Sequence, residues 1–297
     1  RPLDYIRLLE DSYGGAGRRL GEAVVGSGSN WISEATDAAD FPLFEAVLEK
    51  SRGVVVHSSF YLRAVRQVFS GPATMIPLAV PPAPAALPVS RRELGVPQDR
   101  ILMVSTGYTN RPKLNHEVIE AMGLNRNLAN QALFAIIGAD CPVETPKLKA
   151  MARAYGIENS VLFPGFQTWE RMHAWIQNAD FCINLRRPNT EGASCSLIEQ
   201  MRHGKAVVVI RTGFYAEVPE DAVAVWDGTD ASSLAELLLR LAADTDWRGR
   251  IGAAAREAGR FARSIVPVKD ALGDVILDHD EHLVEVSVYS LLEADEN

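Results

Sequence analysis

The 297-residue sequence has few cysteines, no excess of positive charge and no long apolar run. The three cysteines, Cys141, Cys182 and Cys195, form an odd set without paired spacing, which argues against a disulfide framework or a zinc ribbon and favours the reducing cytoplasm. No apolar run approaches the length of a membrane span. Lys and Arg number 30 against 38 Asp and Glu, and this net charge of −8 argues against nucleic acid as a partner. An anionic ligand must therefore be held by a few placed groups.

The remaining composition is that of a globular protein, with 47% apolar and 23% charged residues. The length suggests two domains of ordinary size. The first methionine is Met75, although the residues before it already read as structured. We therefore expect this chain to be the later portion of a longer protein.

Proline and charge divide the chain into four parts. Six of the 16 prolines lie between Pro77 and Pro97, a density that predicts an extended linker over residues 81–98. Residues 1–80 then form the end of one α/β domain, and residues 99–263 form a second. Residues 264–297 form an acidic tail, because nine acidic residues and one basic residue follow Pro267.

Short apolar runs alternate regularly with helical patterns in both domains. Strands are expected at residues 54–56, 74–76, 101–104, 133–137, 161–163, 181–185, 206–210 and 222–225. This alternation predicts an α/β fold with parallel sheets covered on both faces, the first domain being incomplete. Ligands of such sheets bind beyond the carboxyl ends of the strands.

The most informative segment runs from Glu191 to Val208 and carries two glutamates eight positions apart, Glu191 and Glu199. They span a loop that enters a helix near Ser194. The amides and the dipole at a helix start attract anions without any basic side chain. Such a loop places one carboxylate at a ligand's edge and the other deeper along the helix.

This segment resembles the donor domain of the retaining GT-B glycosyltransferases of family four. Their signature is a Glu, seven residues and a second Glu, then Met or Ala, a glycine and a Val-Val strand. The matching residues here are Glu191, Glu199, Met201, Gly204, Val207 and Val208. The resemblance extends in order over nearly the whole chain. Its further segments are 54–58, 76–80, 94–97, 161–166 and 179–180.

The resemblance implies a role for each residue of the segment. Glu191 would be catalytic and contact the transferred sugar, and Glu199 would bind the ribose hydroxyls. The backbone amides of Gly192, Ala193, Ser194 and Cys195 would bind the sugar and the diphosphate. Gly165 would belong to the loop that binds the base.

The family usually places Gly-Arg, four residues and Lys after the first donor-domain strand. Here Gly107 and Lys113 fit that pattern, whereas Tyr108 stands at the arginine position. Lys113 is expected to be catalytic by stabilising the leaving diphosphate, and Arg111 from the same loop would replace the missing arginine.

The expected function is transfer of a sugar from a nucleotide diphosphate donor to an acceptor hydroxyl, in polysaccharide or glycoconjugate biosynthesis. The acceptor is a sugar, a lipid-linked or a small molecule. No metal and no further cofactor are expected, and nucleic acid is not a partner. A peripheral membrane association would come through the missing N-terminal part, and this chain alone would be inactive.

Other interpretations remain open at this point. Another GT-B activity, such as a sugar-nucleotide epimerase or a phosphorylase, fits the same fold. A non-catalytic nucleotide-sugar-binding or assembly module fits the departure at Tyr108. His57 is expected to form hydrogen bonds within its own neighbourhood. His279 and His282 are expected to belong to a charged helix rather than to bind a metal.

Overall fold

The computed structural model describes residues 2–26, 41, 43–81, 84 and 89–261. The chain divides into two compact units. The first contains residues 1–78 and 187–193, and the second contains residues 79–186 and 194–264. The predicted tail, with His279 and His282, lies outside the described residues. No helix in the described ranges combines the length and the apolar character needed to cross a bilayer.

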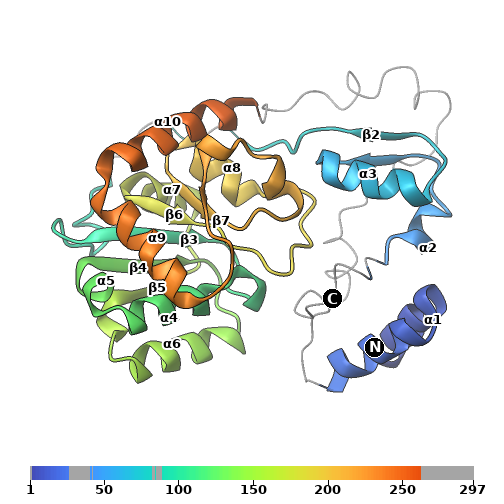
Figure 1. Ribbon diagram of the computed structural model, residues 1–297, viewed down its shortest axis with the longest axis horizontal. Helices are drawn as coiled ribbons and strands as arrows, with labels where there is room; N and C mark the ends of the chain where they lie inside the picture. Colours follow the sequence, from blue (N-terminus) through green and yellow to red (C-terminus); the bar gives the residue numbers. More distant parts are fainter. Residues whose placement is uncertain (1, 27–40, 42, 82–83, 85–88, 262–297) are drawn as a thin grey trace. The chain divides into compact units, whose positions relative to one another are not determined.

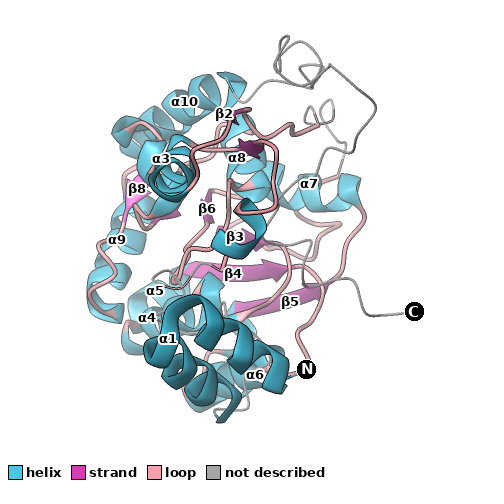
Figure 2. Cartoon of the chain, turned by 90° about the vertical axis from the view of Figure 1, so that its right-hand side faces the viewer, coloured by secondary structure: helices cyan, strands magenta, loops and turns pink. Residues whose placement is uncertain are grey.

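The second unit is built on a six-stranded parallel sheet in the order β5-β4-β3-β6-β7-β8. Strands β3, β4 and β5 lie side by side in Figure 2. The bounds are β3 (Ile101–Thr106), β4 (Ala132–Ile137), β5 (Val161–Gly165), β6 (Phe181–Ile183), β7 (Val207–Val209) and β8 (Ala224–Val225). Strand β8 is shorter than predicted because a 3₁₀ turn takes Glu220–Ala222. The α/β fold class and its parallel sheet are thus confirmed.

Helices cover both faces of this sheet (Figure 1). The helices are α4 (Asn115–Leu124), α5 (Arg126–Gln131), α6 (Glu144–Ala154), α7 (Trp169–Asn178), α8 (Cys195–Arg202), α9 (Ala231–Ala243) and α10 (Thr245–Phe261). Alternate residues of a strand serve opposite faces. In β3, Met103 packs with α4 and α9, whereas Leu102 and Val104 pack with α7 and α8.

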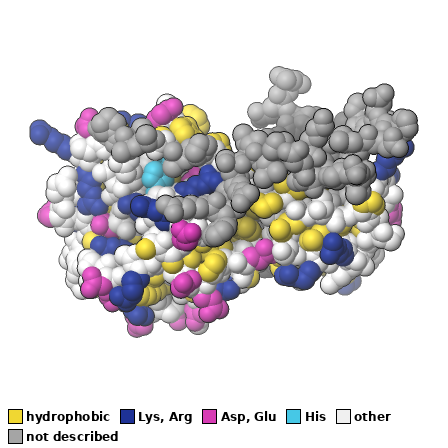
Figure 3. Space-filling model, turned by 90° about the horizontal axis from the view of Figure 1, so that it is seen from above, with side chains coloured by type: hydrophobic (Ala, Val, Ile, Leu, Met, Phe, Trp, Pro, Cys, Tyr) yellow, Lys and Arg dark blue, Asp and Glu magenta, His cyan; other side chains and the backbone are white. Residues whose placement is uncertain are grey.

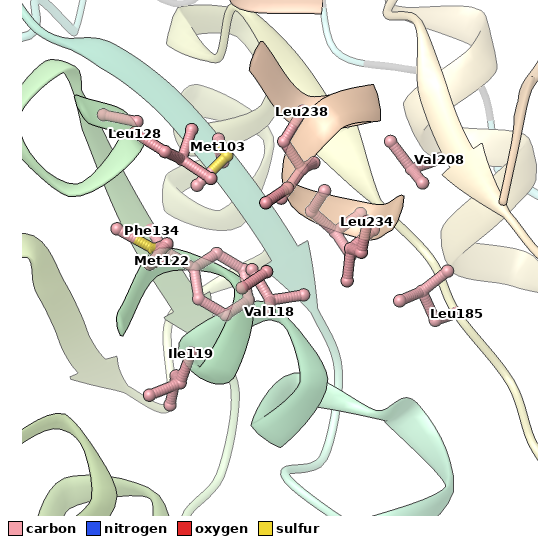
Figure 4. Close-up of a cluster of buried hydrophobic side chains, with 14 of the residues drawn as sticks. Met103, Val118, Ile119, Met122, Leu128, Phe134, Leu185, Val208, Leu234 and Leu238 are labelled. Atoms are coloured by element: carbon pink, nitrogen blue, oxygen red, sulfur yellow. The ribbon is translucent and has the colours of Figure 1, made fainter. Parts of the chain in front are cut away.

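The core on the α4 side is one continuous cluster of buried apolar residues. Figure 4 shows Val118 and Met122 of α4 and Leu234 and Leu238 of α9 gathered over the sheet residue Met103. Each fully buried aliphatic side chain of this kind contributes about 1.5–3 kcal/mol. This packing fixes the strand ends from which the loops of the site emerge.

The first unit is smaller. It contains the helices α1 (Pro2–Gly26), α2 (Glu45–Leu48) and α3 (Ser59–Val68) and a two-stranded parallel sheet of β1 (Val54–Val56) and β2 (Ala73–Met75). Helix α1 is broken at Gly14 by a φ of 61°. Ser58 caps α3, because its side chain accepts a hydrogen bond from the Tyr61 amide. Two small apolar clusters hold these elements.

The linker expected over residues 81–98 lies in the joining segment after β2. Between Met75 and Ile101 the described residues form turns and extended chain, without helix or strand. This agrees with the proline density of the segment.

Candidate functional site

The loop after β3 carries a buried lysine. Lys113 is only 5% exposed, and its Nζ donates a hydrogen bond to the Thr106 carbonyl oxygen over 2.6 Å. Gly107 adopts a φ of 103°, and a Cβ there would lie 2.9 Å from the Lys113 Nζ. The glycine therefore serves both the turn and the close approach of the ammonium group.

Arg111 belongs to the same loop but has a different environment. Its side chain is 51% exposed and its guanidinium lies 3.5 Å from a carboxylate oxygen of Glu144. Tyr108, at the position of the arginine expected from the resemblance, is 42% exposed. The role of Arg111 toward a diphosphate stays a prediction.

Three glycines line adjacent strand ends. The Gly107 amide donates to the Ile137 carbonyl, and the Gly138 amide donates to the Gly165 carbonyl. A Cβ at Gly138 would overlap the Gly107 carbonyl oxygen. The structure thus brings the predicted Gly107 and Gly165 to neighbouring positions at the carboxyl edge of the sheet, with Gly138 between them.

The start of α8 is held by a polar network. Ser194 caps the helix by accepting a hydrogen bond from the Leu197 amide, and its Oγ lies 3.0 Å from the Tyr215 hydroxyl. Tyr215 is fully buried and donates to Asn184 Oδ1 over 2.8 Å. These hydrogen bonds fix the direction of the first turn of α8, which begins at Cys195, relative to the sheet. The first-turn amides and the helix dipole there favour an anion.

Glu191, Gly192 and Ala193 lie in the loop 187–193, which groups with the first unit. The Glu191 amide donates to the side chain of Asn189 over 3.1 Å. Within this unit, burial and then the charge of Glu191 raise the pKa of Tyr61 to about 12. The charge of Glu191 therefore acts on the half-buried phenol of Tyr61 in α3.

Glu199 is 6% exposed on α8. Its Oε1 lies 3.5 Å from Nε2 of His173 on α7. A carboxylate this deeply buried is kept ionised only where partners stabilise its charge. The histidine was not anticipated from the sequence, since nothing local connects residues 173 and 199.

Two further buried polar residues were missed by sequence reasoning. Arg186 follows β6, is 5% exposed and lies 3.4 Å, through its guanidinium, from Asn110 Oδ1 in the loop after β3. Asn115 is 1% exposed at the start of α4, and its side-chain amide has no hydrogen-bond partner among the described residues. A polar residue directly after a buried strand was the available signal for Arg186. No signal in the sequence distinguished Asn115.

The described residues contain no group of three or more His, Cys, Asp or Glu side chains arranged to hold a metal ion. A hollow of about 680 Å³ beside β8 is lined by none of the predicted site residues. Figure 3 shows Lys and Arg interspersed with Asp and Glu on the visible face, rather than gathered in a stripe. The polar groups at the carboxyl ends of β3 and β6 are therefore the best candidate site.

A six-stranded parallel sheet covered by helices on both faces, with a buried lysine, a buried arginine and a capped helix start at its carboxyl edge, defines an α/β protein of the GT-B glycosyltransferase fold. Residues 88–258 match the family described as glycosyl transferases group 1. The chain belongs to this family.

Individual relatives are more distant. The chain is 27% identical over 181 residues to a D-inositol 3-phosphate glycosyltransferase of Thermobifida fusca, which covers 58% of this chain and 41% of that protein. The structure is similar to that of WaaG, a glycosyltransferase involved in lipopolysaccharide biosynthesis (TM-score 0.60, 19% identity, 69% of this chain and 57% of WaaG). It is also similar to Anabaena Alr3699/HepE in complex with UDP and glucose (TM-score 0.61, 19% identity, 74% of this chain and 63% of HepE). The chain thus spans less than two thirds of the length of each relative.

Proposed function

We propose that this chain carries the donor site of a retaining glycosyltransferase, which moves a sugar from a nucleotide diphosphate to an acceptor hydroxyl. The observation that carries this proposal is the pair of buried cations, Lys113 and Arg186, at the carboxyl ends of β3 and β6. Both contact Asn110: the Lys113 amide donates to its carbonyl, and the Arg186 guanidinium approaches its side chain. Burying two positive charges near one loop suits a doubly charged anion.

The cations support catalysis as well as binding. The leaving diphosphate gains negative charge in the transition state, so a cation fixed beforehand lowers the barrier. Arg186 supplies the charge that is absent at Tyr108, from the neighbouring strand rather than from the same loop. Arg111 is a weaker candidate because Glu144 already pairs with it.

The glutamates and loop amides complete the donor site. Glu199 binds the ribose hydroxyls, and Glu191 contacts the transferred sugar and acts in catalysis. The amides from Gly192 to Cys195 bind the sugar and the diphosphate, Gly107 lets the chain approach the phosphates, and Gly165 belongs to the base-binding loop. Retention of configuration and these roles follow from the family resemblance.

The remaining parts of the proposal concern the whole protein. The acceptor is a sugar, a lipid-linked or a small molecule, within polysaccharide or glycoconjugate biosynthesis in the cytoplasm. The reaction uses no metal and no cofactor beyond the donor. This chain binds the donor but transfers sugar slowly or not at all.

Calorimetric titration with UDP, GDP, ADP and their glucose conjugates tests the donor site. We expect Glu199→Ala to weaken every nucleotide, and Glu191→Ala to weaken only the sugar nucleotides. Loss of a hydrogen bond to a charged group costs about 1.5–3 kcal/mol, or roughly 10- to 100-fold in affinity. Glu220, an exposed carboxylate beside the hollow at β8, gives a matched control variant, Glu220→Ala.

Two outcomes oppose the proposal. Unchanged nucleotide affinity in Glu199→Ala would remove the ribose role. A donor sugar that changes configuration without any acceptor would instead indicate an epimerase.

A further inference from the structure

Two histidines meet in the interior of the second unit. Nδ1 of His173, on α7, lies 2.7 Å from Nε2 of His203, at the end of α8. His173 is completely buried. Since the two nitrogens are at hydrogen-bond distance, one proton lies between them.

The charge state of His203 limits how that proton is placed. Burial, followed by smaller contributions from the nearby His173, Lys205 and Arg256, lowers the pKa of His203 to about 4. His203 is therefore neutral near pH 7 and carries one ring proton.

The carboxylate of Glu199 decides between the two tautomers. If His173 donated from Nδ1, the lone pair on its Nε2 would face the Glu199 Oε1 at 3.5 Å. Two electron-rich atoms in a buried site repel each other. For a neutral His173 ring, the favoured arrangement has His203 Nε2–H donating to His173 Nδ1, and the proton of His173 on Nε2, the nitrogen nearer to Glu199 Oε1.

The ring of His173 is also held in place. Trp169, one turn earlier on α7, contacts it edge to face with the ring centroids 4.5 Å apart. Its Nε2 is buried and makes no hydrogen bond within the described residues. A ring nitrogen fixed in this way, 3.5 Å from a carboxylate oxygen, is suited to keeping that carboxylate in position for a third group.

We propose that His173 is a positioning residue for Glu199, with His203 setting its tautomer, so that the carboxylate is held ready for the ribose diol of a nucleotide. The inference rests on the proposed ribose role of Glu199. It adds a relay of three residues, His203, His173 and Glu199, which connects the end of α8 to the nucleotide site through α7.

The experiment compares ligands with and without the diol. The affinities of UDP, GDP and ADP for the 297-residue chain are measured by calorimetry, and the best binder is paired with its 2′,3′-dideoxy analogue. We expect His173→Leu to weaken the ribonucleotide about tenfold, as for a lost hydrogen bond to a charged group, and to leave the dideoxy analogue within about twofold. His173→Gln is the matched variant, because its amide offers a donor near the position of Nε2, and it should recover most of the difference.

A double-mutant cycle tests the tautomer. We expect His203→Leu to weaken the ribonucleotide in the wild-type background and to have no effect in the His173→Gln background, since an amide donates without help. Thermal melting is followed for each variant. If His173→Leu does not fold, the His203→Leu and His173→Gln pair still decides the question.

Each outcome has one meaning. Equal losses for the ribonucleotide and its dideoxy analogue would overturn the positioning role and leave the donor site intact. An equal effect of His203→Leu in both backgrounds would overturn the tautomer assignment. Absence of nucleotide binding in the wild-type chain would overturn the proposed function, and this inference with it.

Discussion

The two units of the chain bury polar groups very differently. Sixteen buried polar or charged side chains are found in the described ranges, and all except Ser58 lie in the second unit. That unit has a six-stranded sheet with a large apolar cluster on each face, whereas the first unit has strands of three residues and two small clusters. A deep core is what allows a protein to enclose charge, because the surrounding elements can supply partners from several directions.

The partners in the second unit form a connected set. Gln200 donates to Thr106 Oγ1 over 3.1 Å, and Asn184 donates to both Gln200 and Ser196 over 3.0 Å. Tyr215 joins the same set through its hydroxyl, which donates to Asn184 Oδ1. The network links the end of β3 to the start of α8. One set of hydrogen bonds therefore positions the strand end and the helix start that are proposed to surround the diphosphate.

The largest expected difference between the units is in core stability. Phe134 is fully buried in the sheet of the second unit, and Phe134→Ala should cost about 3–5 kcal/mol. Val65 lies in the small cluster under α3, and Val65→Ala should cost about 1.5 kcal/mol. Urea unfolding followed by tryptophan fluorescence measures both, and equal losses would contradict the difference in core depth.

Acid should act mainly on the second unit. Burial lowers the pKa of His116 and of His203 from 6.5 to about 4, with smaller contributions from neighbouring positive charges. A histidine with a lowered pKa in the folded state stabilises fully above pH 6.5, and that stability is lost as the pH falls from 6.5 toward 4. The loss is at most about 3 kcal/mol for each histidine.

Urea midpoints measured between pH 7.5 and 4 test this prediction. His203→Gln should flatten the profile, and the surface variant Arg153→Gln should leave its shape unchanged. A profile in which stability rises toward pH 4 would show that these histidines are protonated in the folded state.

The sequence predicted the strands of the second unit because they are continuous apolar runs, and apolar content is local. The run at residues 101–104 lies within β3, and the run at 206–210 contains β7. Gly107 and Lys113 were identified by their spacing in the family pattern, and the structure places them in contact. Local composition and a motif were sufficient for these features.

The residues that were missed owe their environment to distant parts of the chain. In the sequence, Arg186 has the features of a charged loop residue beside Arg187. Only the pairing of β6 with β3 brings it to Asn110. His173 and His203 are 30 positions apart and belong to different helices. Burial of a polar residue depends on which elements pack over it, and a single sequence does not specify that packing.

The buried cations should matter more than exposed ones on the same edge. Arg186→Gln should weaken UDP or GDP binding by about 1.5–3 kcal/mol, because it removes a charged partner from a buried site. Lys113→Gln should lower the rate of sugar transfer more than it weakens donor binding, since the diphosphate charge grows in the transition state. Calorimetry and steady-state kinetics separate the two effects, and unaltered affinity in Arg186→Gln would exclude that arginine from the site.

Arg111 gives the smallest expected effect and the sharpest contrast within one loop. Its guanidinium is half-exposed and lies 3.5 Å from the buried Glu144 carboxylate, which Lys147 also approaches, so Arg111→Gln should shift the urea midpoint only modestly. Because its guanidinium is directed to Glu144, we expect nucleoside diphosphate affinity within about twofold of the wild type. A loss as large as that of Arg186→Gln would mean that Arg111 leaves Glu144 when the ligand binds. Exposure would then be a poor guide to function in this loop. A half-exposed side chain that leaves its ion pair at a small cost in free energy could reach the ligand as readily as a side chain that is already buried beside it.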